Sequence, residues 1–217
     1  IEQIVPEDVF LETEESDPEN LFENYTAGLF DYSGYDETIN RIIDGILHQR
    51  KCLVSYYSVY ERVNKNFYVE PRRIVYFRGG LYVIIYIRRF EKFRLLAIQR
   101  IKHFEVLEEV HPDEPRFDPA LFWKNKFGLF SADSCHVKIE FSTSARMHIE
   151  GRHWHPSQVF SEGKKGSLIL EMDVGLSPEL TSWIFSWNEY AKVLEPPELI
   201  EKISKKIDKL RKLYPTT

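Results

Sequence analysis

Five short strand-like runs follow one another between residues 52 and 107, and they limit the folds open to the first half of the chain. Each run is rich in Val, Ile, Tyr, Phe or Leu, and polar or glycine-containing turns separate them. The runs are Cys52–Val59, Phe67–Phe77, Leu81–Ile87, Phe93–Ile98 and Ile101–Leu107. Pro71 interrupts the second run, which indicates a bend or an edge position in a sheet.

An amphipathic helix precedes these runs. Its apolar residues recur with helical spacing, and they are Ile39, Ile42, Ile43, Ile46 and Leu47. Asp36 or Thr38 can cap its start by accepting from free backbone N–H groups. A helix followed by five antiparallel strands is the order of a small Sm-like or SH3-like β-barrel, which closes a sheet on itself.

The second half of the chain has a different order of elements, β-α-β-β-α-β-α. Cys135–Phe141 alternates as a strand, Thr143–Arg152 reads as a helix, and two strands flank the turn at residues 162–166. Ser177 caps the next helix, with Pro178 at its first position. After a strand at residues 191–194, Pro196 and Pro197 open the last helix. This is the order of a ferredoxin-like α/β sandwich with one extra helix.

We therefore expect an α+β protein with two domains, which suits its 217 residues. An acidic arm covers residues 1–37, and because the chain begins with Ile1 we expect the arm to be the cut edge of a longer protein. The barrel covers residues 38–110, a linker with a short helix covers 111–131, and the ferredoxin-like domain covers 132–217. The longest apolar run has seven residues, far below the roughly 20 that cross a bilayer.

Charge is distributed very unevenly over the chain. The formal net charge of −5 divides into −12 over residues 1–40, +7 over 41–109 and zero over 110–217. Between residues 72 and 102 there are seven Arg, two Lys and a single acid, Glu91. Arg suits phosphate recognition and base stacking better than Lys does, so the barrel is a candidate surface for nucleic acid. A solvated sheet face explains the same residues without any ligand.

Three motifs within the barrel resemble those of the WYL-domain family. Gly79-Gly80-Leu81-Tyr82-Val83 is similar to the Trp-Tyr-Leu motif after its glycine-rich turn, and Phe67 to Pro71 partly matches Arg-x-Val-x-Pro. The third motif, Phe-Arg-Leu…Asp-Arg-Ile, is similar to Phe93-Arg94-Leu95…Gln99-Arg100-Ile101.

The second domain resembles the WCX extension that often follows WYL domains. The similar segments are Trp154 to Gln158, Glu179 to Ile184, Val193 to Pro196, and a terminal helix that ends in Tyr214. Together with the barrel motifs, the resemblance covers residues 38–214.

The resemblance implies the sensor part of a bacterial transcriptional regulator. In the family, the barrel binds a ligand through a basic pocket, for which single-stranded DNA or another nucleic-acid-derived anion is the best candidate. It also implies a homodimer, and duplex DNA as a partner through a helix-turn-helix domain that this chain lacks. Two unpaired cysteines, Cys52 and Cys135, favour a reduced, cytoplasmic setting.

The candidate ligand residues combine Arg, whose guanidinium binds phosphate, with an exposed aromatic ring on which a base can stack. They are Ser58, Arg72, Arg73, Arg78, Tyr82, Arg94 and Arg100. Phe67 stands where the family has Arg, and Arg72 or Arg73 can take its place. Leu81 and Val83 are expected in the core, with Tyr82 on the opposite face of the strand.

Other chemistry has weaker support in the sequence. His153 and His155 have metal-ligand spacing, but no further ligands lie nearby, so we expect no metal and no cofactor. His155 and Gln158 are candidates for a second ligand contact, in the second domain. No catalytic motif is present, and Glu70 and Glu91 stand isolated, so we do not expect an enzyme. The alternatives are an RNA- or single-stranded-DNA-binding module without switching, and a protein-interaction or dimerisation unit.

Overall fold

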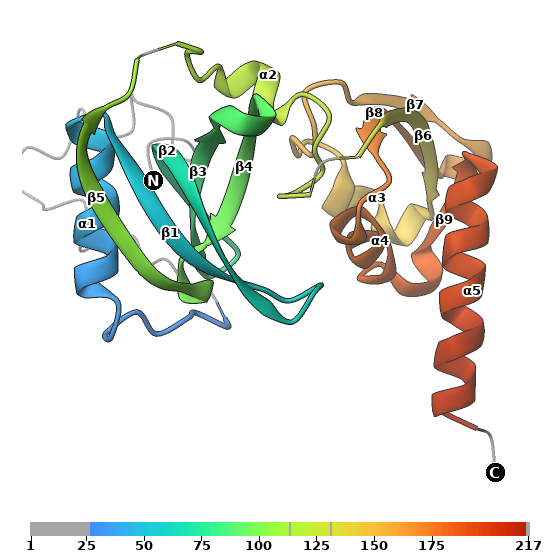
Figure 1. Ribbon diagram of the computed structural model, residues 1–217. Helices are drawn as coiled ribbons and strands as arrows, with labels where there is room; N and C mark the ends of the chain where they lie inside the picture. Colours follow the sequence, from blue (N-terminus) through green and yellow to red (C-terminus); the bar gives the residue numbers. More distant parts are fainter. Residues whose placement is uncertain (1–26, 113, 131, 216–217) are drawn as a thin grey trace, which may run out of the picture. The chain divides into compact units, whose positions relative to one another are not determined.

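A computed structural model gives the fold over residues 27–112, 114–130 and 132–215 (Figure 1). The chain divides into two compact units, with the boundary between Pro115 and Arg116. Residues 1–26 of the expected acidic arm lie outside the described residues. Both units are mixed α+β, which confirms the expected fold class. No described helix has the length and apolar character needed to cross a membrane.

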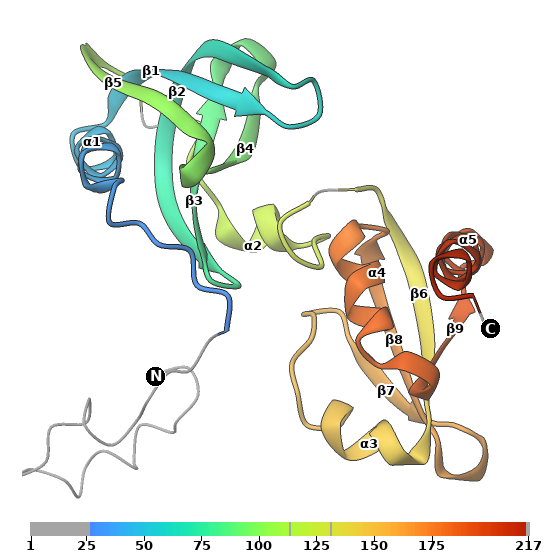
Figure 2. The same cartoon turned by 90° about the horizontal axis from the view of Figure 1, so that it is seen from below.

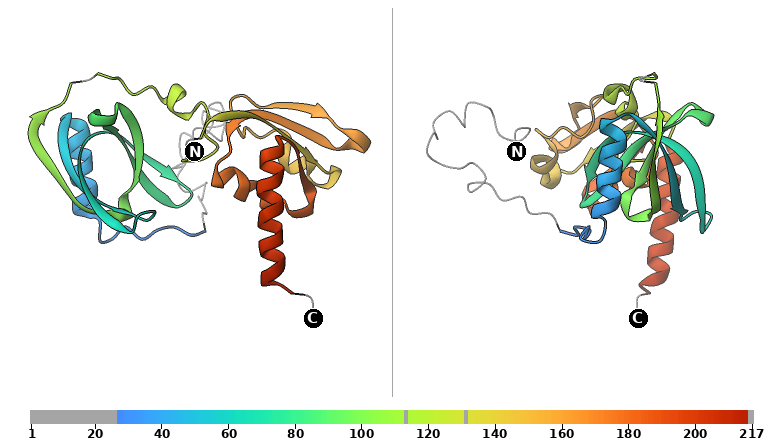
Figure 3. Two further views of the ribbon diagram at one scale, coloured as in Figure 1. Left: turned by 45° about the vertical axis from the view of Figure 1, so that its right-hand side comes forward. Right: turned by 60° about the vertical axis from the view of Figure 1, so that its left-hand side comes forward.

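The first unit is a helix followed by a five-stranded antiparallel sheet with strand order β4-β3-β2-β1-β5. The sheet curls strongly in the left view of Figure 3, and the Tyr56 hydroxyl on β1 accepts from the Ala97 N–H on β4 at 3.2 Å. The elements are α1 (Asp36–Leu47), β1 (Arg50–Ser58), β2 (Val63–Phe77), β3 (Gly80–Ile87), η3 (Arg88–Phe90), β4 (Lys92–Ala97), η4 (Ile98–Arg100) and β5 (Ile101–Val110).

Helix α1 packs against β1, β2 and β5, and the core lies between the helix and the inner face of the sheet. Leu81 and Val83 both belong to this core, as expected. Gly45 allows the close approach of the helix, because a Cβ at that position would lie 2.8 Å from the Cys52 sulfur. Burial raises the pKa of that thiol to about 12, so Cys52 is a core residue and not a reactive one.

One local expectation for the first unit is wrong. Neither Asp36 nor Thr38 caps α1: the N-cap position is Tyr35, and its side chain makes no capping hydrogen bond. The helix instead continues from a turn in which the Tyr35 N–H donates to the Tyr32 carbonyl at 2.8 Å. Of the two alternatives for Pro71, the bend fits and the edge does not: β2 is central in the sheet, and the register shift between Pro71 and Arg73 accommodates the missing N–H.

The second unit contains a four-stranded sheet with strand order β7-β8-β6-β9, as in a ferredoxin-like sandwich. Figure 2 shows its helices beside the sheet. The elements are α2 (Pro119–Trp123), β6 (Ser134–Phe141), α3 (Thr143–Ile149), β7 (Val159–Glu162), η5 (Lys164–Gly166), β8 (Leu168–Gly175), α4 (Pro178–Phe185), η6 (Asn188–Tyr190), β9 (Ala191–Glu195) and α5 (Pro197–Leu213).

Aromatic rings fill the core of the second unit. The Trp154 and Trp183 ring centroids lie 4.9 Å apart, and Trp183 also meets Phe141 at 5.8 Å. Ser177 caps α4 as expected, because its hydroxyl accepts from the Leu180 N–H at 3.1 Å. This cap fixes the start of the helix that carries Trp183 into the core.

Candidate functional site

Arg100 lies at the end of η4, with its guanidinium 5.0 Å from the centroid of the Tyr56 ring. Tyr56 is buried in the core of the first unit and presents its ring to this cation. Within the described residues, Arg100 forms no ion pair with a carboxylate. Arg100 also hydrogen-bonds the Tyr56 phenol, and the other N–H groups of its guanidinium are available to an anion.

Tyr82 acts on the Tyr56 phenol electrostatically. Burial raises the pKa of Tyr56, the Ala97 N–H and Arg100 oppose that rise, and the Tyr82 phenol adds to it. Tyr82 pairs with Ala97 across β3 and β4 and is half-buried. Of the two predicted residues, Arg100 thus contacts the Tyr56 ring directly, and Tyr82 acts on the Tyr56 phenol through its charge.

Residues 27–35, which we call the strap, also reach this site. The Tyr32 hydroxyl accepts from the Leu81 N–H at 2.6 Å and donates to the Gln99 side chain at 3.2 Å. Burial raises the pKa of Tyr32; the Leu81 backbone hydrogen bond opposes this, and the Tyr82 phenol adds to it. The site thus consists of Tyr32, Tyr56, Tyr82 and Arg100, which we call the tyrosine–arginine cluster.

Arg94 does not share a sheet face with Tyr82. Arg94 is opposite Ile85, whereas Tyr82 is opposite Ala97, and side chains directly opposite on neighbouring strands point to the same face. Ile85 belongs to the core of the first unit, and Tyr82 alternates with core residues along β3. The candidates Arg94 and Tyr82 therefore project from opposite faces of the sheet, and one face does not carry both.

Arg72 is held in a buried ion-pair network instead of facing a ligand. Its Nη2 donates to the Glu70 carboxylate at 3.0 Å, and Glu70 also accepts from Arg88 Nε at 2.7 Å. Arg72 Nη1 lies 2.7 Å from Nε2 of His111. Because a guanidinium only donates, this nitrogen accepts, and we infer from the network that Nδ1 donates to the Pro112 carbonyl at 3.0 Å.

The three remaining barrel candidates lie at the β1–β2 turn, on β2 and in the β2–β3 turn. Ser58 ends β1, and its hydroxyl accepts from the Glu61 N–H at 3.4 Å within the β1–β2 turn. Arg73 is exposed on β2, opposite Ile84. Arg78 is exposed in the β2–β3 turn, with its guanidinium 5.3 Å from the Phe77 ring.

In the second unit, Gln158 stabilises a loop. Its side-chain oxygen accepts from the His155 N–H at 3.1 Å, and its nitrogen donates to the Arg152 carbonyl at 2.8 Å. His155 is buried, and its Nδ1 lies 2.8 Å from the Ser157 hydroxyl. Burial lowers the pKa of His155, while the Lys124 carbonyl acts in the opposite direction. No group of three metal-ligating side chains occurs among the described residues.

Sequence reasoning missed Tyr32 and misjudged Glu70. Residues before Asp36 have no helical or strand period, yet Phe30, Tyr32 and Tyr35 place three rings within a short stretch, which was the available signal. Their rings pack at centroid distances of 4.8 and 5.7 Å. Glu70 is not isolated, because the fold supplies both Arg partners.

Comparison with known families finds a match in each unit. A model of the WYL domain matches residues 37–106, and a model of the WCX domain matches residues 133–211. No curated protein matches the chain.

Two solved structures are similar. Proteasome accessory factor B/C of Arthrobacter aurescens is 18% identical with a TM-score of 0.40, and the match covers 88% of this chain and 29% of that one. A CRISPR Cas-related protein is 13% identical with a TM-score of 0.57, and the match covers 82% of this chain and 52% of that one. The chain thus spans about half or less of each of these proteins, and the second likeness concerns the fold alone.

Proposed function

The chain belongs to the WYL-domain family and carries a WCX domain after its WYL domain, and from this premise we propose that it is the sensor part of a bacterial transcription regulator. Domains of these two kinds are regulatory and in general not enzymatic. The regulator works as a homodimer in the cytoplasm, a setting consistent with two free cysteines, Cys52 and Cys135.

The ligand is a single-stranded nucleic acid or a nucleotide-type anion, bound at the tyrosine–arginine cluster. The observation that carries this proposal is the Arg100 guanidinium, which lies 5.0 Å over the Tyr56 ring and has no carboxylate partner among the described residues. Arg binds phosphate through charge-assisted hydrogen bonds, and a base stacked on an aromatic ring contributes about 1–3 kcal/mol. Tyr82, which is half-buried on β3, supplies the stacking ring.

Ligand binding then controls the binding of the regulator to duplex DNA, which a helix-turn-helix domain outside this chain carries out. The strap supports this step, because it connects the upstream chain to the cluster through Tyr32. Leu81 and Gln99, which bond the Tyr32 hydroxyl, are the sequence neighbours of Tyr82 and Arg100. A ligand that shifts Tyr82 or Arg100 therefore acts directly on the anchors of the strap.

The test is oligonucleotide binding to the full chain, measured by fluorescence anisotropy with a labelled oligothymidylate of about ten nucleotides. Arg100→Ala is expected to weaken binding about tenfold, because a charge-assisted hydrogen bond contributes about 1.5–3 kcal/mol. It is also expected to reduce the salt dependence by about one phosphate contact. Tyr82→Ala is expected to weaken oligonucleotide binding. Tyr82→Phe keeps the stacking ring and is expected to bind the oligonucleotide like the wild type.

Arg62→Ala is the matched control, since Arg62 is an exposed arginine in the β1–β2 turn of the same unit and belongs to no candidate site. It is expected to leave oligonucleotide affinity unchanged. Equal affinity of the Arg100→Ala and wild-type proteins, with both folded by circular dichroism, contradicts the site. Binding that is insensitive to salt contradicts a phosphate ligand.

A further inference from the structure

A groove of about 990 Å³ runs along the first unit, and none of its lining residues belongs to the tyrosine–arginine cluster. We call it the outer groove. Glu70 pairs with Tyr86 across β2 and β3, one position away from the core residues Val69 and Ile85, so both project from the outer face of the sheet. The residues that matter below are Lys51, Tyr68, Arg88, Arg89 and Phe90.

The floor of the outer groove holds a cation in a fixed orientation. The Glu70 side chain is only 6% exposed and accepts from Arg88 Nε at 2.7 Å and from Arg88 Nη2 at 3.0 Å. Arg88 Nη2 also donates to the Glu114 carbonyl at 3.0 Å. The Arg88 side chain is still 51% exposed. Glu70 therefore orients the guanidinium, while the rest of the side chain stays accessible to a ligand in the groove. An anion that binds there does not have to order this side chain.

The walls of the outer groove pair apolar rings with further cations. Tyr68 and Phe90 are 56% and 60% exposed, which is high for large aromatic side chains. Lys51 Nζ lies 4.9 Å from the Tyr68 ring centroid but is also paired with the Glu109 carboxylate at 2.8 Å. The Arg89 guanidinium lies 5.6 Å from the Phe90 ring centroid, so Phe90 offers an apolar surface beside a positive charge.

We propose that the outer groove binds a small amphiphilic anion, in which a carboxylate or phosphate group is attached to a flat apolar body. The anionic group faces Arg88 and Arg89, and the body lies on Tyr68 and Phe90. Glu70 does not repel the anion, because both of its oxygens accept from guanidinium groups. The volume falls within the range of about 300–1,000 Å³ that is usual for small-molecule sites.

The experiment uses 2-naphthoate as the probe and 2-naphthamide as its uncharged counterpart, each titrated into the isotope-labelled full chain by NMR. Saturable binding of 2-naphthoate is expected, with amide shifts at residues 65–70 and 86–90. The neutral amide should bind about tenfold more weakly, because it lacks the charge-assisted hydrogen bond. The double variant Tyr68→Ala/Arg89→Ala should lose binding by a similar factor, and it leaves the Glu70 network intact.

The matched control is Tyr76→Ala/Arg78→Ala, which removes an exposed Tyr and an exposed Arg near the β2–β3 turn, outside the groove lining. It is expected to bind 2-naphthoate like the wild type. Equal affinity for the acid and the amide overturns the anionic part of the proposal. Unchanged binding by the Tyr68→Ala/Arg89→Ala variant, shifts centred on Arg100, or no saturation overturns the site itself. None of these outcomes depends on oligonucleotide binding, so the proposed function stands or fails separately.

Discussion

Glu70 is a buried carboxylate that binds both Arg72 and Arg88 beneath the outer groove. Its side chain and that of Arg72 are 6% and 9% exposed, so replacing Glu70 leaves a buried guanidinium without this carboxylate. Glu70→Ala is therefore expected to lower the free energy of unfolding by about 3 kcal/mol, measured by urea denaturation. Glu61→Ala is the control, because Glu61 pairs with Lys65 at the surface, where an ion pair contributes less than about 1 kcal/mol. Equal losses in the two variants contradict a buried network.

His111 makes this network sensitive to pH. Burial lowers the pKa of His111 below its ordinary value of 6.5; the charges of Arg72 and Arg88 act in the same direction, and the Pro112 carbonyl and Glu70 oppose them. In the pH range below 6.5 the unfolded chain takes up a proton before the folded one does. Stability is therefore fully present above that value and falls as the pH drops, down to the folded-state pKa.

His111→Gln is expected to remove part of this acid sensitivity. A Gln amide can still accept from Arg72 and donate to the Pro112 carbonyl, but it does not titrate. The measurement is the difference in unfolding free energy between pH 7.5 and about pH 5.5, compared between the variant and the wild type. An identical difference in the two proteins shows that His111 does not contribute.

The ion pairs of Glu70 could not be predicted from the sequence. Arg88 lies 18 residues further along the chain, and the register shift after Pro71 sets where Arg72 points. A sequence pattern gives the face of a side chain only while strict alternation holds. The alternation rule predicted the correct face on β3, where alternation is regular, because Tyr82 lies on the opposite face of the strand from Leu81 and Val83.

At the scale of elements, the strap depends on a glycine in the β2–β3 turn. The Phe30 N–H donates to the Gly79 carbonyl at 2.9 Å, and a Cβ on Gly79 would lie 2.6 Å from the Gly28 carbonyl oxygen. Gly79→Ala should therefore both strain the backbone, at φ +81°, and push the strap away. We expect faster amide exchange over residues 28–35.

Gly28→Ala separates the two effects. Gly28 has nearly the same φ of +78°, but nothing lies within 4 Å of its added Cβ. It should cost about 1 kcal/mol of backbone strain without releasing the contacts of Tyr32. If both variants raise the amide exchange rate of the strap equally, the close approach between Gly79 and Gly28 does not hold the strap in place.

The order of elements could be predicted from the sequence, because local periodicity and turn residues indicate where each strand and helix lies. All five expected strands of the first unit and the ferredoxin-like order of the second are present, with ends shifted by a few residues. The start of α1 could not be predicted from capping preferences, because the turn from Tyr32 to Tyr35 fixes it. That turn depends on tertiary bonds to Leu81 and Gln99, which are distant in sequence.

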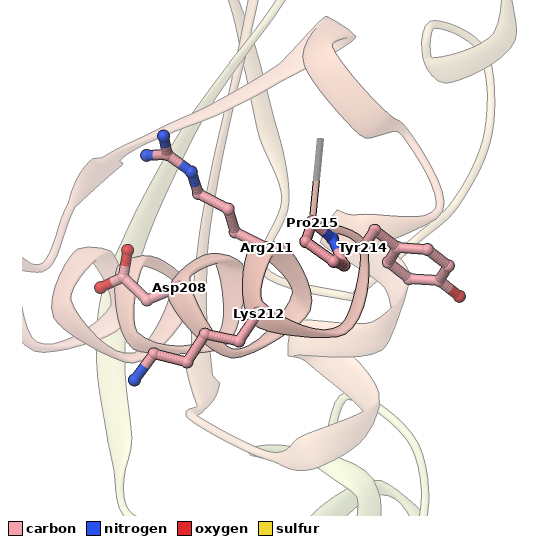
Figure 4. Close-up of a pocket in the computed structure, with 5 residues that line it drawn as sticks. All are labelled: Asp208, Arg211, Lys212, Tyr214 and Pro215. Atoms are coloured by element: carbon pink, nitrogen blue, oxygen red, sulfur yellow. The ribbon is translucent and has the colours of Figure 1, made fainter. Parts of the chain in front are cut away.

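At the scale of the whole molecule, the proposed homodimer needs a surface, and α5 offers one. Ile200, Ile203, Ile207, Leu210 and Tyr214 follow the three-and-four spacing of a coiled-coil seam. Leu199 is the buried residue of this helix, Ile203 packs partly against the core of its own unit, and Ile207 is 50% exposed. Around the end of the helix, Figure 4 shows the Tyr214 ring directed away from Asp208 and Lys212. A narrow apolar stripe with charged residues beside it is typical of a helix that pairs with another helix.

Ile207→Asp is therefore expected to convert the dimer into a monomer in size-exclusion chromatography with light scattering. An aspartate at a seam position would be buried against the partner helix without a counter-charge, whereas in the monomer it stays half-exposed and costs little. Lys212→Glu is the control, because position 212 lies on the opposite side of the helix from the seam, and this variant should remain dimeric. A dimeric Ile207→Asp protein would place the interface elsewhere, and a wild-type monomer at micromolar concentration would contradict the homodimer itself.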